Sequence, residues 1–188
     1  MSDPVADARR FTELYNATRR DLLAYLVRRT GDPEQAADLL SETYLIAWRR
    51  LEHVPHGNGE RLWLFGVARN LLLKTAHHQR LHETLITNIA NELERIAQVD
   101  GAAPDGPRVD ALRDGIARLP ANEREALLLT AWEGFAPREI AEITRASANV
   151  TRVRLARARR KLRRHLADER RTSERLEGAA SRSDLSRS

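Results

Sequence analysis

The sequence predicts an all-α protein with two small helical domains joined by a flexible linker. Apolar residues recur at helical spacing in two separate parts of the chain. Between these parts lies VDGAAPDGP, which has two Gly and two Pro in nine residues and is typical of a linker. Aromatic residues make up 5% of the chain, too few for a typical sandwich or barrel. We expect a first domain over 6–82, a linker over 83–108, a second domain over 109–167 and a disordered tail over 168–188.

The first domain begins with a helix and a second helix close behind it. The first helical stripe stops at TGDPEQ, where Gly31 can close one helix, Asp32 can cap the next and Pro33 fits its first position. In the second helix, about 33–51, the predicted inward stripe contains Ala36, Ala37, Leu40, Tyr44, Ala47, Trp48 and Leu51. Asp38 and Glu42, four residues apart, share a different face.

A breaker-rich loop, EHVPHGNGE, precedes a third helical segment, RLWLFGVARNLLLKTAHHQR, whose polar face is basic. His78 and His82 are four residues apart in this segment, a spacing that a metal ion can bridge. Histidine pairs on a basic helix are more often ordinary polar residues, so we expect no metal. We expect no other cofactor either.

The second domain contains the pattern of a helix-turn-helix. Pro120 interrupts the chain, and Asn122 can cap a helix that Gly134 closes. Pro137 fits the first position of the short helix PREIAEIT, and RASA connects it to the longer helix VTRVRLARARRKLRRHL. A short helix, a tight connection and a longer basic helix are typical of this DNA-binding motif.

Positive charge is concentrated in that last helix. The chain has a net charge of +5 and a pI near 10.3, which favours polyanionic partners. The helix carries no acidic residue between Val150 and Leu166, and Leu155, Ala158 and Leu162 give it a narrow apolar stripe for packing. A nucleic-acid backbone is the partner that this pattern favours, although most charge runs are only solvated helix faces.

Several classes of protein are excluded or disfavoured. The chain has no cysteine, which rules out disulfides and thiolate-bound zinc. The start, MSDPVADARR, lacks the pattern of a secretion signal, and we expect a cytoplasmic protein. No glycine-rich nucleotide loop or nucleophile elbow is evident, so we expect no enzymatic activity.

Two blocks of the sequence resemble the extracytoplasmic-function (ECF) sigma factors of the sigma-70 class. DLLSETYLIAWRRL and RLWLFGVARNLLL are similar to region 2 of that family, and LPANEREALLLTAWEGFAPREIAEI with VRLARARRKLRRHL is similar to region 4. The resemblance spans about Phe11 to Leu166. It implies a dissociable subunit of RNA polymerase whose region-2-like bundle binds the polymerase clamp and opens the minus-ten element. The region-4-like helix-turn-helix would read the minus-thirty-five element.

The resemblance also implies roles for individual residues. The expected contacts to core polymerase are Asp38, Leu39, Glu42 and Leu45. The expected contacts to the minus-ten DNA are Arg69, Asn70, Lys74 and Arg80. The expected contacts to the minus-thirty-five DNA are Arg145, Asn149, Thr151, Arg152, Arg154, Arg157 and Arg159. Promoter DNA and core RNA polymerase are thus the expected partners, with a cognate anti-sigma protein as a further one.

The chain departs from the family pattern at several positions. Arg145 stands where the turn usually has Gly, so either it adopts an unfavourable positive φ or the turn has another shape. Thr151 replaces a residue that is usually apolar, and VPHGNGE does not match the usual loop. Two alternatives therefore stay open: a free-standing helix-turn-helix regulator with residues 1–82 as a dimerisation or sensing domain, and a protein that sequesters a polymerase or sigma partner without directing initiation.

Overall fold

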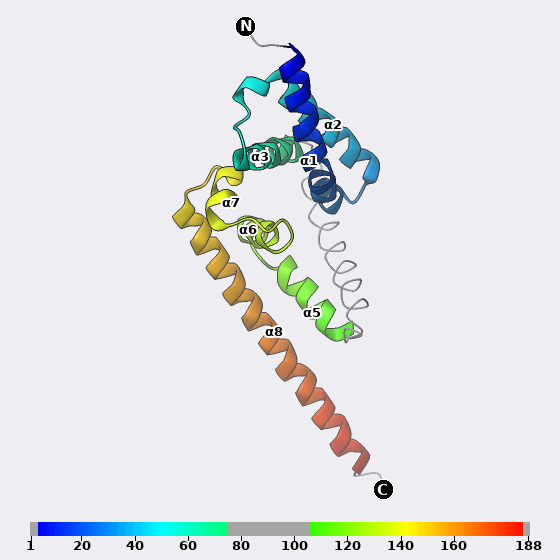
Figure 1. Cartoon of the computed structure of the whole chain (residues 1–188). Coiled ribbons are helices and arrows are strands. Elements are labelled where there is room, and N and C mark those ends of the chain that lie inside the picture. Colours follow the sequence, from blue (N-terminus) through cyan, green and yellow to red (C-terminus); the bar gives the residue numbers. More distant parts are fainter. Residues whose placement is uncertain (1–3, 75–105, 186–188) are drawn as a thin grey trace.

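The protein is all-helical over the residues that its computed structural model describes, which are 4–74 and 106–185 (Figure 1). The fold class expected from the sequence is confirmed. The elements are α1 (Pro4–Thr30), α2 (Pro33–Arg49), a 3-10 turn η1 (Leu51–His53), α3 (Asn58–Lys74), α5 (Gly106–Ala117), α6 (Ala121–Ala131), α7 (Pro137–Thr144) and α8 (Ala148–Leu185). Within these ranges, no helix has the length and apolar character needed to span a membrane. His78, Arg80, His82 and nearly all of the predicted linker lie outside the described residues.

The helices α1, α2 and α3 form the first domain around one apolar core. Tyr25, Leu22 and Leu26 of α1 pack against Leu64 and Phe65 of α3, and all five side chains are fully buried. Burying each of these side chains contributes about 2 kcal/mol relative to exposure. Apolar burial is therefore the main force that holds the three helices together.

The turn between α1 and α2 follows the local sequence signals. Gly31 has a positive φ of 66°, which a residue without Cβ adopts readily. The Asp32 side chain accepts hydrogen bonds from the backbone N–H groups of Glu34 (2.9 Å) and Gln35 (3.3 Å). Pro33 occupies the first turn of α2, as predicted.

The buried stripe of α2 differs from the predicted one. Ala37 and Trp48 were expected inside but are exposed, whereas Leu39 and Thr43 are buried. The hydroxyl of Thr43 donates to the backbone oxygen of Leu39 at 2.7 Å, which satisfies its polar atom inside the helix. The polar residue Thr43 thus lies on the inward face. The buried stripe of α2 therefore includes Leu39 and Thr43 in place of Ala37 and Trp48.

The second domain consists of α5 to α8. Asn122, predicted to cap α6, lies inside this helix instead, because Pro120 takes the cap position and its carbonyl accepts the N–H groups of Glu123 and Arg124, both at 2.9 Å. Gly134 has a φ of 71° after α6, consistent with its predicted closing role. Pro137 begins α7 as predicted.

The connection between α7 and α8 keeps the helix-turn-helix geometry although it lacks the usual glycine. Arg145 adopts the left-handed conformation with φ 52°. Directly after it, the Ala146 N–H donates to the Ala141 carbonyl at 2.9 Å, the bond that commonly ends a helix at such a residue. Ser147 then accepts the N–H of Val150 at 3.2 Å and caps α8.

The helix α8 continues to Leu185, so the prediction of a disordered tail over 168–188 is wrong for the described part of that segment. Arg, Glu, Ala and Leu, which are good helix formers, are frequent there. Arg171 also pairs with Asp168 at 3.8 Å, one helical turn away. Figure 1 shows α8 extending well beyond α5.

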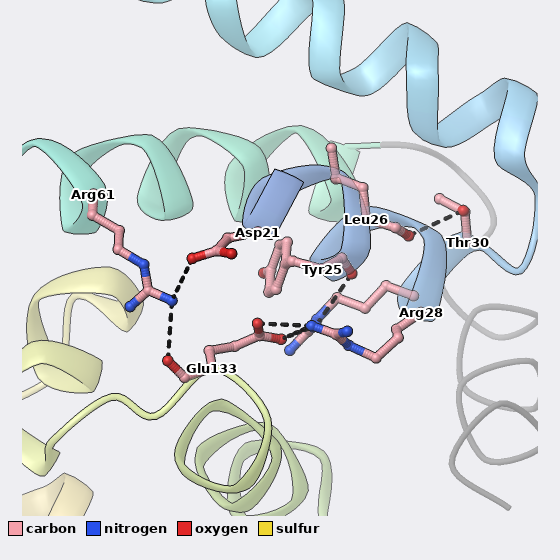
Figure 2. A network of polar contacts seen from close by, with 8 residues as sticks. Asp21, Tyr25, Leu26, Arg28, Thr30, Arg61 and Glu133 are labelled. Atoms are coloured by element: carbon pink, nitrogen blue, oxygen red, sulfur yellow. Dashed lines mark hydrogen bonds and ion pairs between the residues drawn. The ribbon is translucent and has the colours of Figure 1, made fainter. Parts of the chain in front are cut away.

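The two domains pack against each other mainly through α3 and α7. Arg69 of α3 also bonds Glu125 of α6, and Arg28 of α1 bonds Glu133 just after α6. The rings of Phe65 and Phe135 meet edge to face at a centroid distance of 4.9 Å. The carboxylate of Glu133 lies at the same interface and accepts two hydrogen bonds from Arg28, each 2.8 Å long (Figure 2). It also lies 3.5 Å from the Arg29 guanidinium. The Glu133 side chain is 3% exposed.

A third arginine reaches the same residue from α3. Arg61 donates to the backbone oxygen of Glu133 at 3.1 Å and pairs with Asp21 of α1 at 3.3 Å (Figure 2). Its guanidinium also lies 4.2 Å from the Phe135 ring centroid. Polar and aromatic contacts therefore fix the same small area of the domain interface.

We predict that Arg145→Gly stabilises the protein by about 1 kcal/mol, because glycine removes the steric cost of the left-handed conformation. Urea denaturation measures the free energy of unfolding. Ala146→Gly is the matched control and should destabilise, since its φ is not positive and the added glycine mainly increases unfolded-state entropy. A destabilising effect of both changes would contradict the strain at Arg145.

We predict that Glu133→Gln lowers the free energy of unfolding by about 3 kcal/mol, because it removes the buried anion that Arg28 and Arg29 contact. Glu13→Gln removes an exposed carboxylate paired with Arg9 and should change stability by less than about 1 kcal/mol. Equal effects of the two substitutions in urea denaturation would show that Glu133 has no special role.

We predict a loss of stability at alkaline pH that depends on Tyr25. Burial raises the pKa of its hydroxyl to about 12 from the ordinary value of 10.0. The contribution of the neutral Tyr25 hydroxyl to the free energy of unfolding is complete below pH 10. Between pH 10 and 12 it decreases by roughly 1 kcal/mol per pH unit, because in this range Tyr25 loses its proton in the unfolded chain but keeps it in the folded protein. Tyr25→Phe should remove this component when urea denaturation is compared at pH 9 and pH 11. If the free energy of unfolding fell equally between pH 9 and pH 11 in the wild type and in Tyr25→Phe, the alkaline loss of stability would not come from Tyr25.

Candidate nucleic-acid interface

One face of α8 is buried and the opposite face is open to solvent. Thr151, Leu155 and Ala158 point into the domain, each at 3% exposure or less. The opposite side presents polar, basic and small apolar residues: Asn149, Arg152, Val153, Ala156, Arg157, Arg159 and Arg160. A surface of this composition suits contact with both base edges and phosphates.

The exposed arginines near the start of α8 have no acidic partner among the described residues, as seen for Arg152, Arg157 and Arg159. Lys161, in contrast, pairs with Glu123 of α6 at 2.9 Å and so helps to hold α8 in place. The positive charge at the start of the helix is therefore available to a partner.

Two of the predicted base-edge and phosphate contacts need separate comment. Thr151 was expected near base edges, but this is wrong: its side chain is buried and its hydroxyl donates to the backbone oxygen of Ser147 at 3.1 Å. That internal bond lets a threonine occupy a position that is usually apolar. Arg154 is partly buried at the flank of the exposed face, whereas Asn149 is exposed.

Sequence reasoning missed two residues on the same face. Val150 and Val153 are 42% and 40% exposed, one helical turn apart. The signal was present, since these apolar residues do not fit the buried stripe of Leu155 and Ala158. They add an apolar component to a surface that otherwise looks purely basic and polar.

Asn70 and Lys74 of α3, expected at the minus-ten DNA, line a cavity of about 660 Å³ between the two domains. Arg145 lines the same cavity from the turn before α8, so it lies beside α3 in this conformation. Trp63, Val67 and other apolar side chains contribute to the wall. The cations around this cavity are Arg49, Arg50, Lys74 and Arg145.

Arg69 is directed toward the second domain. Its guanidinium forms two bonds to the carboxylate of Glu125 in α6, at 2.7 and 2.9 Å. The hydrogen bond to Glu125 raises the pKa of Arg69, against an opposing effect of burial. In this conformation, the donors of Arg69 that are expected to contact DNA are engaged within the protein.

The loop between α2 and α3 is anchored to α1. Arg10 donates to the backbone oxygens of Leu51 (2.9 Å) and Val54 (2.6 Å), and the Val54 side chain is buried. Leu51 and Val54, at the start of this loop, are thereby held in a defined position. Pro55 and Gly59 of this loop line the interdomain cavity.

A separate exposed face of α2 carries three of the four residues expected to contact polymerase. Asp38 and Glu42 are exposed, and Leu45 is 46% exposed, at helical spacing along one side. Leu39 is 4% exposed and belongs to the core, so its expected place on this surface is wrong. The shift of the α2 stripe through Thr43 accounts for its burial.

Comparison with known proteins agrees with this geometry. The family model for sigma-70 region 2 matches residues 14–81, and the model for sigma-70 region 4 matches residues 110–162. The ECF RNA polymerase sigma factor SigL of Mycobacterium tuberculosis is 29% identical over 163 residues, which cover 84% of this chain and 89% of the relative. BldN of Streptomyces coelicolor, another ECF sigma factor, is 30% identical over 168 residues, covering 87% of this chain and 62% of the relative.

A solved structure supports the fold. The sigma factor RpoE of Bartonella quintana, crystallised with the anti-sigma factor NepR, aligns with a TM-score of 0.57 at 21% identity, covering 85% of this chain and 98% of that chain. The two family models together match more than half of the chain and correspond to its two helical domains. The chain therefore belongs to the sigma-70 family, as an ECF-type sigma factor that binds RNA polymerase and directs it to promoters.

Proposed function

We propose that this sigma factor reads the upstream promoter element with the exposed face of α8. The observation that carries the proposal is a set of exposed arginines at the start of a helix whose opposite side is buried in a helix-turn-helix. Within the described part of the chain, no acidic side chain pairs with Arg152, Arg157 or Arg159. Asn149 and Arg152 lie in the first turns, which approach base edges in this motif. Arg157 and Arg159 lie further along and would contact phosphates, which makes binding salt-dependent.

The outward face of α2 is the proposed contact to core polymerase. Asp38 and Glu42 provide negative charge for a basic partner surface, and Leu45 provides apolar area beside them. Exposed carboxylates are common on any helix, so the combination with an exposed leucine on the same face is what supports the assignment. Trp48, 47% exposed, continues the apolar area toward the end of α2.

The basic side of α3 is the proposed contact to the minus-ten DNA. Asn70 and Lys74 are accessible from the interdomain cavity, while Arg69 would first have to leave Glu125. Promoter opening at this surface therefore requires the second domain to move away from α3. The role of Arg80 in the same contact also remains a prediction, since it lies outside the described residues.

Regulation by an anti-sigma protein is part of the proposal. The structurally similar sigma factor from Bartonella quintana forms a complex with an anti-sigma factor. We further propose that the chain acts in the cytoplasm, on the nucleoid, and has no catalytic activity of its own. The resemblance to non-enzymatic polymerase subunits supports these statements.

Run-off transcription with purified chain, core RNA polymerase and genomic fragments tests the function. We expect discrete transcripts that fall about 10-fold with Arg152→Ala or Asn70→Ala, because each change removes one group that contacts DNA. Arg9→Ala, which changes an exposed arginine on α1, is the control and should leave transcription unchanged.

Other outcomes favour the alternative functions. Binding to core polymerase without transcripts would indicate a sequestering protein. Tight binding to duplex DNA without any binding to core would indicate a free-standing regulator. Either result would reject the initiating role.

A further inference from the structure

We propose that Val153, assisted by Val150, determines promoter specificity by contacting the 5-methyl group of thymine in the upstream element. This inference rests on the proposed role of α8 and adds a direct apolar reading of the base sequence. Thymine is the only base of DNA that presents a methyl group in the major groove, and apolar side chains contact it there. The basic residues of α8 cannot make this distinction through phosphate contacts.

The position of Val153 on the helix supports this role. At 100° per residue, Val153 lies on the side of α8 opposite Thr151, Leu155 and Ala158, which are buried. Asn149, four residues earlier, lies on the same outward side. An apolar side chain is thus among those that point away from the domain, and it stands next to one that can read adenine.

The two valines are close enough to act on neighbouring bases. Val150 precedes Val153 by about one helical turn, which is about 4.5 Å along the axis. Successive base pairs are about 3.4 Å apart. Both valines also belong to the first two turns of α8, the part of a recognition helix that enters the groove.

No packing need explains these residues. Both are at least 40% exposed, and the buried side of α8 is already filled by other side chains. Valine is a weaker helix former than arginine or alanine, which are both frequent in α8. An isolated exposed valine would be ordinary, but here two lie within one turn of the helix, next to exposed arginines.

The first step of the test defines the upstream element. Duplexes are selected for binding to the full chain in complex with core RNA polymerase. Each thymine of the selected upstream element is then replaced singly by deoxyuridine, which removes only the 5-methyl group and keeps the base pair. Dissociation constants are measured for the wild-type chain and for Val153→Ala on every duplex.

We expect two adjacent thymines, one contacted by Val153 and one by Val150, at each of which deoxyuridine weakens binding of the wild-type complex about 4-fold, the effect of losing one buried methyl contact. The Val153→Ala complex should bind the thymine and deoxyuridine duplexes with equal affinity at the position that Val153 contacts. Val150→Ala should abolish the same effect at an adjacent thymine. Val5→Ala changes an exposed valine of α1 and is the matched control, which should behave like the wild type.

Specific outcomes would overturn the inference. One is a selected upstream element without thymine, and another is unchanged affinity of the wild-type complex for every deoxyuridine duplex. A deoxyuridine effect of the same size in Val153→Ala and Val150→Ala would assign the methyl contact to another residue. In all these cases sequence-specific binding would persist, so the proposed function would stand. Absence of any sequence-specific complex would instead reject both.

Discussion

The carboxylate of Glu133 is buried between the two domains, next to the guanidinium groups of Arg28 and Arg29. The residue follows α6, at the helix end where the dipole disfavours negative charge. Burial of this anion is tolerable only while the arginines of the first domain surround it. Because Glu133 must stay beside these arginines, the next residues, Gly134 and Phe135, start from a fixed position. The contact with Glu133 therefore also determines how the helix-turn-helix is placed beside α3.

The DNA-contact surfaces proposed for the two domains differ in accessibility because of this packing. The outward face at the start of α8 is open, and Arg152, Arg157 and Arg159 lack acidic partners among the described residues. On α3, Arg69 is held by Glu125, and Asn70 faces a cavity that the second domain helps to enclose. An upstream contact through α8 is therefore compatible with the closed arrangement, whereas a downstream contact through Arg69 is not.

The sequence predicts what depends on neighbours in the chain. Asp32 and Pro137 begin helices and Gly134 ends one, because caps and turns are set by local chemistry. The predictions for Leu39 and Thr151 are wrong because two threonines are buried like apolar residues. The hydroxyls of Thr43 and Thr151 each donate to the backbone oxygen four residues earlier. Burial of Thr43 turns the side of α2 that carries Leu39 inward. The contact of Arg28 with Glu133 joins positions 105 residues apart, and no local pattern announces it.

The pairing of Arg69 with Glu125 has a thermodynamic consequence. Glu125 acts as a tethered competitor for any anion that approaches this guanidinium, with an effective concentration set by the chain that connects the domains. Linkage makes the competition reciprocal: domain closure weakens anion binding at Arg69 by the same factor by which a bound anion weakens closure. The free energy with which α3 binds nucleic acid is therefore reduced by the free energy needed to separate the two domains at this contact.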